Sequence, residues 1–321
     1  MVAPAGETTV TDVYTPVDLE EATEFLARHP GAVPVAGGTD VMIDRRLGRL
    51  ETDWLVDLSR LEGLGSIEVT DDTVTVGALT PVRALELDSA LMSVAPALVE
   101  AARVLGSVQV RNMATLGGNL CHATPSAELA PPLLALGATA TVRGPGGGRE
   151  LPVADLFGGP GVNTLAPGEL LTRVTFPVVA NSGSTYLRQT IRWSMDLAGV
   201  GTAAWMELDS GGRVTSARVA LGAVAPTPLV VPGVAELLGG RNWGHELGGE
   251  VAALASGACS PISDARGTAR YRRHVAGILA RRALHIAWLR AGGDWPDGTP
   301  APVNGVLPPD WARADGGESD R

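Results

Sequence analysis

Hydrophobic positions near the start of the chain recur at helical spacing and predict a first helix, which contains Leu19, Ala22, Phe25 and Leu26. The preceding Thr15-Pro16-Val17-Asp18 is typical of a helix start. We expect Thr15 to cap the helix, Pro16 to take its first position and Asp18 to complete a reciprocal cap. The apolar stretch AVPVAG then predicts a strand. The next residues, GGTD, predict a turn from which Asp40 caps a short helix ending near Leu47.

The same periodicities assign most of the remaining chain. Alternating or apolar runs predict a strand at 54–59 and another at 169–177, and hairpins at 66–79, 138–156 and 204–224. Helical spacing predicts helices at 90–105 and 128–136. A long amphipathic helix at 268–290 carries an apolar stripe, with arginines on its other faces, and we expect those arginines to be solvated. The stripe consists of Tyr271, Val275, Ile278, Leu279, Ile286 and Leu289.

Chain length and composition indicate more than one domain. A chain of 321 residues with 45% hydrophobic content is long for a single small core. The composition turns small and polar around 178–185, and we expect a domain boundary there. From residue 291 the chain is rich in proline and glycine, and we expect this tail to be disordered.

Charge and cysteine content exclude several classes of function. A formal net charge of −10 argues against nucleic acids and anionic membrane surfaces as partners. Two cysteines, Cys121 and Cys259, are too few for a disulfide framework, so we expect a reducing, cytoplasmic location. They are also too few for an iron–sulfur cluster, and the five histidines show no paired metal-ligand spacing. No signal peptide is visible, and no apolar run approaches the roughly 20 residues of a membrane helix.

Two Gly-Gly pairs, Gly37-Gly38 and Gly117-Gly118, are the strongest candidates for a binding function. Consecutive glycines let backbone N–H groups point into one concavity, which binds oxyanions, and a following helix adds a favourable dipole. A single Gly-Gly pair more often forms only a tight turn, but two such pairs in one domain favour a binding role. Neither fits GxGxxG or GxxxxGK[ST], so the common dinucleotide and ATP patterns are unsupported. The residues alone therefore predict a two-loop phosphate clamp in an α+β domain.

Longer motifs around these pairs resemble a known family. The stretches VAGGTD and RNMATLGGNLCHATPSAELAPPLLALGA resemble the FAD-binding (medium) subunit of the molybdenum hydroxylases. That family includes xanthine dehydrogenase, aerobic carbon monoxide dehydrogenase and 4-hydroxybenzoyl-CoA reductase. The likeness continues in LRQTIRWSMDLAGVGTAAW, ALGAVAPTPLVV and SDARGTARYRRHVAGILARRAL, and covers roughly residues 10–290.

The resemblance implies an α+β fold with two domains. The first, at 1–178, would be a vanillyl-alcohol-oxidase-type FAD-binding domain of two α/β subdomains, about 1–58 and 59–178. The second, at 183–290, would be a small antiparallel sheet packed on a helical bundle. Residues 291–321 would form the disordered tail.

The resemblance also implies the cofactor, FAD, and the residues that bind it. It assigns the pyrophosphate to two loops. The first consists of Ala36, Gly37, Gly38, Thr39 and Asp40, flanked by Pro34, Val35 and Val41, and the second of Thr115, Leu116, Gly117, Gly118 and Asn119. It places Leu105, Leu171 and His122 against the cofactor. Glu128 stands where xanthine dehydrogenases have an aspartate that holds the adenosine, and Arg188 where the family has a lysine near the isoalloxazine. No catalytic or metal-binding residue is implied.

Each of these positions also has a purely structural interpretation. Leu105 and Leu171 could be ordinary core residues, and Glu128 could cap the helix that it opens. Arg188 could be a surface charge. Cys121, beside the second loop, is interpreted as a small buried filler in preference to a redox thiol.

In function, the resemblance implies an electron-transfer flavoprotein subunit. A large partner subunit would hold the molybdenum cofactor and a small partner would hold two [2Fe–2S] clusters. FAD would pass the electrons to an external acceptor, either NAD⁺, a quinone or oxygen. One alternative is a stand-alone FAD oxidase or dehydrogenase of the same fold. Another is a nucleotide-binding regulatory module without flavin chemistry.

Overall fold

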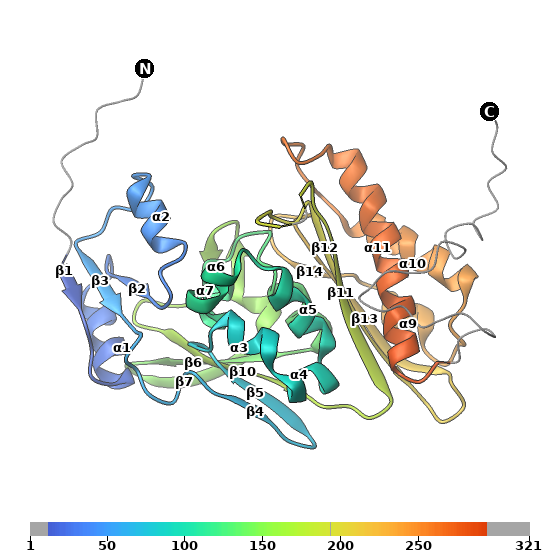
Figure 1. Ribbon diagram of the computed structural model, residues 1–321, viewed down its shortest axis with the longest axis horizontal. Coiled ribbons are helices and arrows are strands. Elements are labelled where there is room, and N and C mark those ends of the chain that lie inside the picture. The colour runs from blue at the N-terminus through green and yellow to red at the C-terminus, as the bar shows by residue number, and fades with distance from the viewer. Residues whose placement is uncertain (1–11, 193, 294–321) are drawn as a thin grey trace.

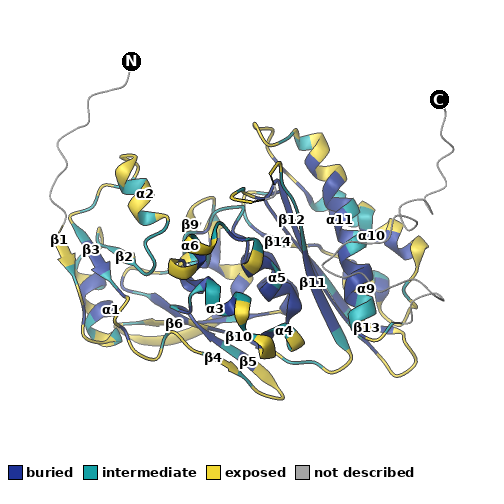
Figure 2. Ribbon diagram, viewed as in Figure 1, coloured by how far each residue is buried: buried dark blue, intermediate teal, exposed yellow. Residues whose placement is uncertain are grey.

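The computed structural model describes residues 12–192 and 194–293 (Figure 1). At its N-terminal end a three-stranded parallel sheet has the order β1-β3-β2. Its strands are β1 (Asp12–Tyr14), β3 (Trp54–Asp57) and β2 (Val33–Val35). Helix α1 (Leu19–Arg28) buries its apolar face in a small core that contains Phe25 and Val56. Helix α2 (Val41–Arg46) follows β2 and has no buried residue, as Figure 2 shows.

The start of α1 lies three residues later than the sequence indicates. Asp18, not Thr15, is the N-cap, and its carboxylate accepts a hydrogen bond from the Glu21 N–H at 2.8 Å. The Glu21 carboxylate in turn accepts from the Val17 N–H at 2.7 Å. The reciprocal cap therefore forms between Asp18 and Glu21, because a glutamate can reach back over a full turn.

The central part of the chain forms a five-stranded antiparallel sheet with the order β4-β5-β10-β6-β7. Its strands are β4 (Ile67–Val69), β5 (Thr73–Gly77), β10 (Leu170–Pro177), β6 (Thr139–Gly144) and β7 (Gly147–Pro152). The predicted hairpins at 66–79 and 138–156 are thus confirmed. A short 3-10 helix (Val153–Leu156) and a small hairpin, β8 (Phe157–Gly159) and β9 (Val162–Asn163), lead back towards β10.

Six short helices cover one face of this sheet and bury the largest hydrophobic core (Figures 1 and 2). They are α3 (Val82–Leu87), α4 (Ser89–Val94), α5 (Pro96–Val104), α6 (Val108–Met113), α7 (Leu116–Cys121) and α8 (Ala130–Leu136). The single helix predicted at 90–105 is wrong. The chain breaks at Ala95, because Pro96 has no N–H to continue α4 and instead opens α5.

The C-terminal part forms a four-stranded antiparallel sheet, β11-β12-β13-β14, with three helices on one face (Figure 1). The strands are β11 (Ser182–Gln189), β12 (Val200–Leu208), β13 (Val214–Gly222) and β14 (Leu229–Val230). The helices are α9 (Val234–Leu238), α10 (His245–Ala258) and α11 (Ala269–Arg290). This arrangement confirms the predicted small sheet packed on helices, and the α+β class of the whole chain.

Two details of α11 differ from the expectation. Tyr271 is exposed although it belongs to the predicted apolar stripe, and Arg272 is buried with 4% of its surface accessible. The arginine is buried because it pairs with Asp264, which precedes the helix. Of the tail predicted to be disordered, residues 294–321 lie outside the described residues. Within the described ranges, no helix has the length and apolar character needed to cross a membrane.

The central helices and the C-terminal sheet share a buried contact. Helices α5 and α8 pack on β11, β12 and β13 on the face opposite α11. Glu100 of α5 accepts hydrogen bonds from Thr185 and from the Tyr186 N–H at 2.8 Å each. Its other oxygen accepts from Arg290 at 2.6 Å. One carboxylate therefore ties α5, β11 and the end of α11 together.

Candidate functional site

The two glycine pairs lie in adjoining loops. A Cβ on Gly37 would stand 1.7 Å from the Met113 carbonyl oxygen, and Met113 ends the helix just before the second loop. Across the same junction, His122 Nε2 lies 4.0 Å from Asp40 Oδ1. Gly37 is thus required for close approach of two backbones, and the loops border one site.

The first loop presents free hydrogen-bond donors. Among the described residues, no acceptor takes the backbone N–H of Gly37, Gly38, Thr39 or Asp40. Gly38 has a φ of +67°, a conformation that glycine adopts without steric cost. Successive free amides around a left-handed residue form an anion-binding concavity, and α2 begins directly after it.

The second loop is built differently from the expectation. Its first amides are already used: Leu116 N–H donates to the Thr80 carbonyl, Gly117 N–H to the Ala78 carbonyl and Gly118 N–H to Thr115 Oγ1. The predicted nest of free amides is therefore wrong for this loop. A Cβ on Gly117 would lie 2.8 Å from the Ala78 Cβ, so this glycine serves close packing.

The second loop can contact a ligand through its side chains, because its first backbone amides are already hydrogen-bonded. Asn119 Oδ1 accepts from the Leu129 N–H at 3.2 Å, and this bond orients the amide. His122, at the end of α7, is partly exposed and faces Asp40 of the first loop. Burial raises the pKa of the Cys121 thiol to about 12, so the thiol stays protonated at neutral pH.

Glu128 and Arg188 meet in one buried cluster. Arg188 Nη1 donates to Glu128 Oε1 at 2.7 Å, and the Tyr186 hydroxyl donates to Glu128 Oε2 at 2.5 Å. Burial raises the pKa of the Glu128 carboxyl, while the adjoining Arg188 charge and the Tyr186 hydrogen bond oppose that rise. Burial also raises the pKa of Tyr186 well above its usual value, so the phenol stays protonated and donates.

Two alternative interpretations from the sequence are therefore wrong. Glu128 does not cap α8, whose N-cap is Leu129, and Arg188 is not a surface charge, because only 8% of its side chain is accessible. The two residues that the resemblance assigns to different parts of the cofactor belong to one ion pair between the central helices and β11. Tyr186, the third member, was missed, although it lies two residues before Arg188 and so on the same face of the strand.

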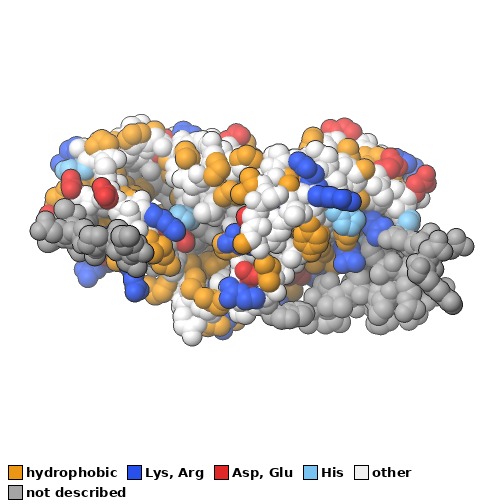
Figure 3. Space-filling model, turned by 90° about the horizontal axis from the view of Figure 1, so that it is seen from above, with side chains coloured by type: hydrophobic (Ala, Val, Ile, Leu, Met, Phe, Trp, Pro, Cys, Tyr) orange, Lys and Arg blue, Asp and Glu red, His pale blue; other side chains and the backbone are white. Residues whose placement is uncertain are grey.

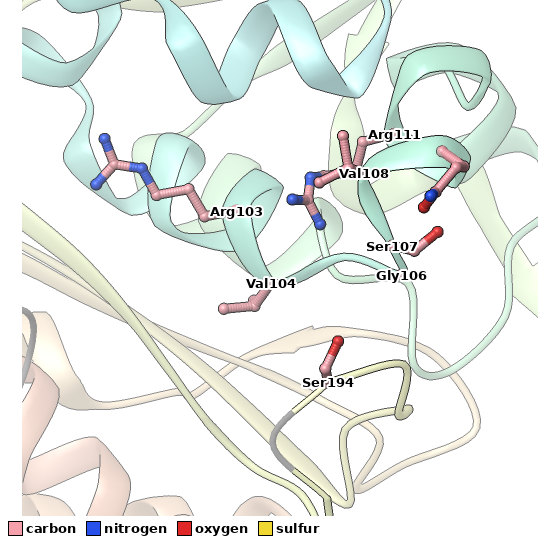
Figure 4. Close-up of a pocket in the computed structure, with 8 residues that line it drawn as sticks. Arg103, Val104, Gly106, Ser107, Val108, Arg111 and Ser194 are labelled. Carbon is pink, nitrogen blue, oxygen red and sulfur yellow. The ribbon is translucent and has the colours of Figure 1, made fainter.

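Leu105 lies at the end of α5 beside a pocket of about 350 Å³. Residues 103, 104, 106–109 and 111 of the α5–α6 segment line one side, and Ser194 of the β11–β12 loop points across from the other (Figure 4). Arg111 is held there by Glu86 at 2.7 Å and by the Leu105 carbonyl at 2.9 Å.

Leu171, on β10, is buried in the main core. Within the described ranges, no His, Cys, Asp and Glu residues group as a metal site.

These features fit a large phosphorylated cofactor. The first loop, with its free amides, lies against the second loop, which presents the Asn119 amide and the His122 imidazole. The buried pair of Glu128 and Arg188 follows the second loop in the chain.

A family model described as the FAD binding domain in molybdopterin dehydrogenase matches residues 8–179, more than half of the chain. The chain belongs to this family of FAD-binding subunits. A second model, the CO dehydrogenase flavoprotein C-terminal domain, matches residues 185–287.

Curated relatives of this flavoprotein subunit agree with that assignment. The carbon monoxide dehydrogenase medium chain of Hydrogenophaga pseudoflava is 30% identical, over 87% of this chain and 97% of the relative. The glyceraldehyde dehydrogenase medium chain of Sulfolobus acidocaldarius is also 30% identical, over 83% and 94%. The xanthine dehydrogenase FAD-binding subunit of Escherichia coli is 30% identical over 86% and 95%.

Solved structures agree as well. Carbon monoxide dehydrogenase from Hydrogenophaga pseudoflava matches with a TM-score of 0.84 and 30% identity, covering 87% of this chain and 98% of that one. Quinoline 2-oxidoreductase from Pseudomonas putida 86 matches with a TM-score of 0.81 and 28% identity, covering 88% and 98%. The cofactor of this oxidoreductase subunit is FAD, as the resemblance implied.

Proposed function

We propose that this chain holds FAD between the two glycine loops and transfers electrons from the iron–sulfur clusters of a partner subunit to an external acceptor. The observation that carries the proposal is the junction of the loops, where Gly37 abuts the backbone at Met113 and Asp40 faces His122. The names of the relatives, medium chain or subunit of a complex, support an assembly with further subunits.

Most of the candidate polar and glycine residues have a distinct physical role in this proposal. The free amides of 37–40 hold the pyrophosphate oxygens, and Asn119 and His122 approach it from the second loop. Buried Glu128 holds Arg188 in place, and Leu105 and Leu171 supply apolar walls. Bound FAD supplies reversible two-electron chemistry, and the protein orients it and excludes water.

The upper side of the molecule in Figure 1 suits a protein partner. Exposed hydrophobic residues gather there on α2, α6, the β11–β12 loop and the start of α11: Met42, Ile43, Leu47, Val108, Met113, Ile191, Met195, Leu197 and Tyr271. Figure 3 looks down on this side and shows basic side chains among the hydrophobic ones across its middle. Hydrophobic and arginine-rich patches are typical of interfaces. We propose that the iron–sulfur partner docks here.

The proposal includes the division of the chain into domains at 1–178 and 183–290. It also includes a cytoplasmic location, because Cys121 and Cys259 are both free thiols.

A stand-alone FAD oxidase or dehydrogenase is the second candidate for the function. The pocket beside Leu105 favours it, since about 350 Å³ could admit a small organic substrate.

Isolation of the native complex through an affinity tag on this chain distinguishes the two candidates. The first predicts that FAD comes with molybdenum and with roughly four iron atoms, since two [2Fe–2S] clusters are expected. Ile191→Glu, on the proposed docking side, should lower the recovery of iron, whereas Val17→Glu, exposed beside α1, should not. A chain that is isolated alone, without metal, and whose flavin is bleached directly by an organic substrate would instead establish the stand-alone enzyme.

A further inference from the structure

Arg272 is a buried cation whose two contacts reach well beyond its own helix. Its Nη1 donates to the Ala223 carbonyl at 3.0 Å, and its Nη2 donates to Asp264 Oδ1 at 2.5 Å. The backbone N–H of Arg266 and the Arg272 charge hold the pKa of Asp264 below its usual value. The pair therefore stays ionised at neutral pH, and Arg272 is fixed against the turn that follows β13.

Ala223 is held in a strained conformation from both sides. Its φ is +64°, a left-handed conformation that is strained for a residue other than glycine. Its N–H donates to the Pro125 carbonyl at 2.6 Å, while its carbonyl accepts from Arg272. Both backbone polar groups of this strained residue are thus used: the carbonyl accepts from α11, and the N–H donates to the segment after the second glycine loop.

That segment, 122–125, borders the cofactor site. It begins at His122, which faces Asp40, and its next residue, Ala123, is also left-handed with a φ of 52°. The Ala123 carbonyl accepts from the Gly161 N–H at 2.9 Å. Gly222, which precedes Ala223, packs against the same region, because a Cβ on it would stand 3.6 Å from the Pro125 carbonyl oxygen and 2.9 Å from Pro131 Cγ of α8. The position of 122–125 therefore depends on the β13–β14 turn.

We propose that Arg272 is a positioning residue for the FAD site. It keeps Ala223 left-handed, Ala223 holds Pro125, and the segment 122–125 then keeps His122 against the first glycine loop. Arg272 touches no part of the glycine loops itself. The inference rests on the proposed function, because the site that Arg272 orders is the proposed FAD site. It also gives a role to the stretch SDARGTARYRR, which the binding site does not otherwise use.

Arg272→Lys tests the proposal in the full-length chain. A lysine keeps the charge but cannot reach a carbonyl and a carboxylate at once with fixed geometry. We expect the Kd for FAD, measured by titrating the apoprotein and following flavin fluorescence, to rise about tenfold, which corresponds to about 1.4 kcal/mol. Ala223→Gly in the same variant should recover part of the affinity, because glycine adopts this φ freely.

Arg290→Lys is the matched control. Arg290 likewise donates to one carbonyl, Ser184, and one carboxylate, Glu100, at 2.6 Å each, and neither partner belongs to the glycine loops or to the segment 122–125. It should lower Tm to a similar extent and leave the Kd for FAD within about twofold. An equal loss of affinity in both variants, no loss in Arg272→Lys, or no recovery with Ala223→Gly would overturn the inference. Failure of the wild-type chain to bind FAD would instead refute the proposed function.

Discussion

At the scale of single residues, Gly38 is the position where backbone conformation bears most directly on the proposed binding of FAD. Its φ of +67° turns the free amides of the first loop to one side, and only Met42 Cγ, at 3.3 Å, would approach an added Cβ closely. Gly38→Ala should therefore reorient the amides through strain of about 1–2 kcal/mol, without a severe clash. We expect the Kd for FAD to rise roughly tenfold in a fluorescence titration.

Gly48 provides the control, because its φ is +66° and nothing lies within 4 Å of an added Cβ. Gly48→Ala introduces the same strain after α2 and should lower Tm without changing the Kd for FAD. If both alanine variants bind FAD like the wild type, the first loop does not hold the pyrophosphate.

Residue patterns predicted some parts of the site and not others. The free amides and the left-handed Gly38 of the first loop could be predicted, because a Gly-Gly turn specifies them locally. Gly117 looked the same in the sequence, yet it serves packing against Ala78, a contact that no local pattern contains. The pairing of Glu128 with Arg188 was likewise hidden, because 60 residues separate them and only the packed sheet brings them together.

At the scale of elements, helix boundaries were the least predictable feature. Apolar spacing continues through Ala95, so it could not show that Pro96 separates α4 from α5. Helix α1 is capped by Asp18 and not by Thr15. Asp18 accepts from the Glu21 N–H, and Glu21 accepts from the Val17 N–H. The hairpins that were predicted are present, because alternation and glycine-rich turns specify them locally. Strands β1, β8, β9, β11 and β14 were not predicted.

Helix α11 carries an acid-sensitive contact. His285 is buried and accepts a hydrogen bond from Trp243 Nε1–H at 3.1 Å, and burial lowers its pKa to about 4. Between pH 6.5 and 4 the unfolded chain therefore binds a proton that the folded chain does not. This stabilisation is complete above pH 6.5 and is lost as the pH falls towards 4.

His285→Gln should reduce the fall in Tm between pH 7 and pH 5, because glutamine can accept from Trp243 and does not titrate. His274→Gln, exposed on the same helix, should show the wild-type fall. Circular dichroism melting curves at the two pH values provide the measurement. An unchanged fall in His285→Gln would show that this histidine does not set the acid sensitivity.

At the scale of the whole molecule, the fold brings together two loops that lie about 80 residues apart in the sequence. Along the chain, β3, β4, β5 and helices α3–α6 lie between the two loops. Helix α6 ends at Met113, and the Met113 carbonyl lies against Gly37 of the first loop. The α+β architecture could be predicted because long motifs carried the family resemblance. The hydrophobic upper side could not, since its residues come from four separate elements, and only the folded chain gathers them.

Identification of the released cofactor tests the central claim most directly. We expect the purified full-length chain to be yellow and to release one FAD per chain on denaturation, as measured by chromatography and absorbance. The proposed site holds the pyrophosphate of FAD between the two loops, and FMN has no pyrophosphate. Release of FMN alone, or a colourless chain that does not take up added FAD, would contradict the account.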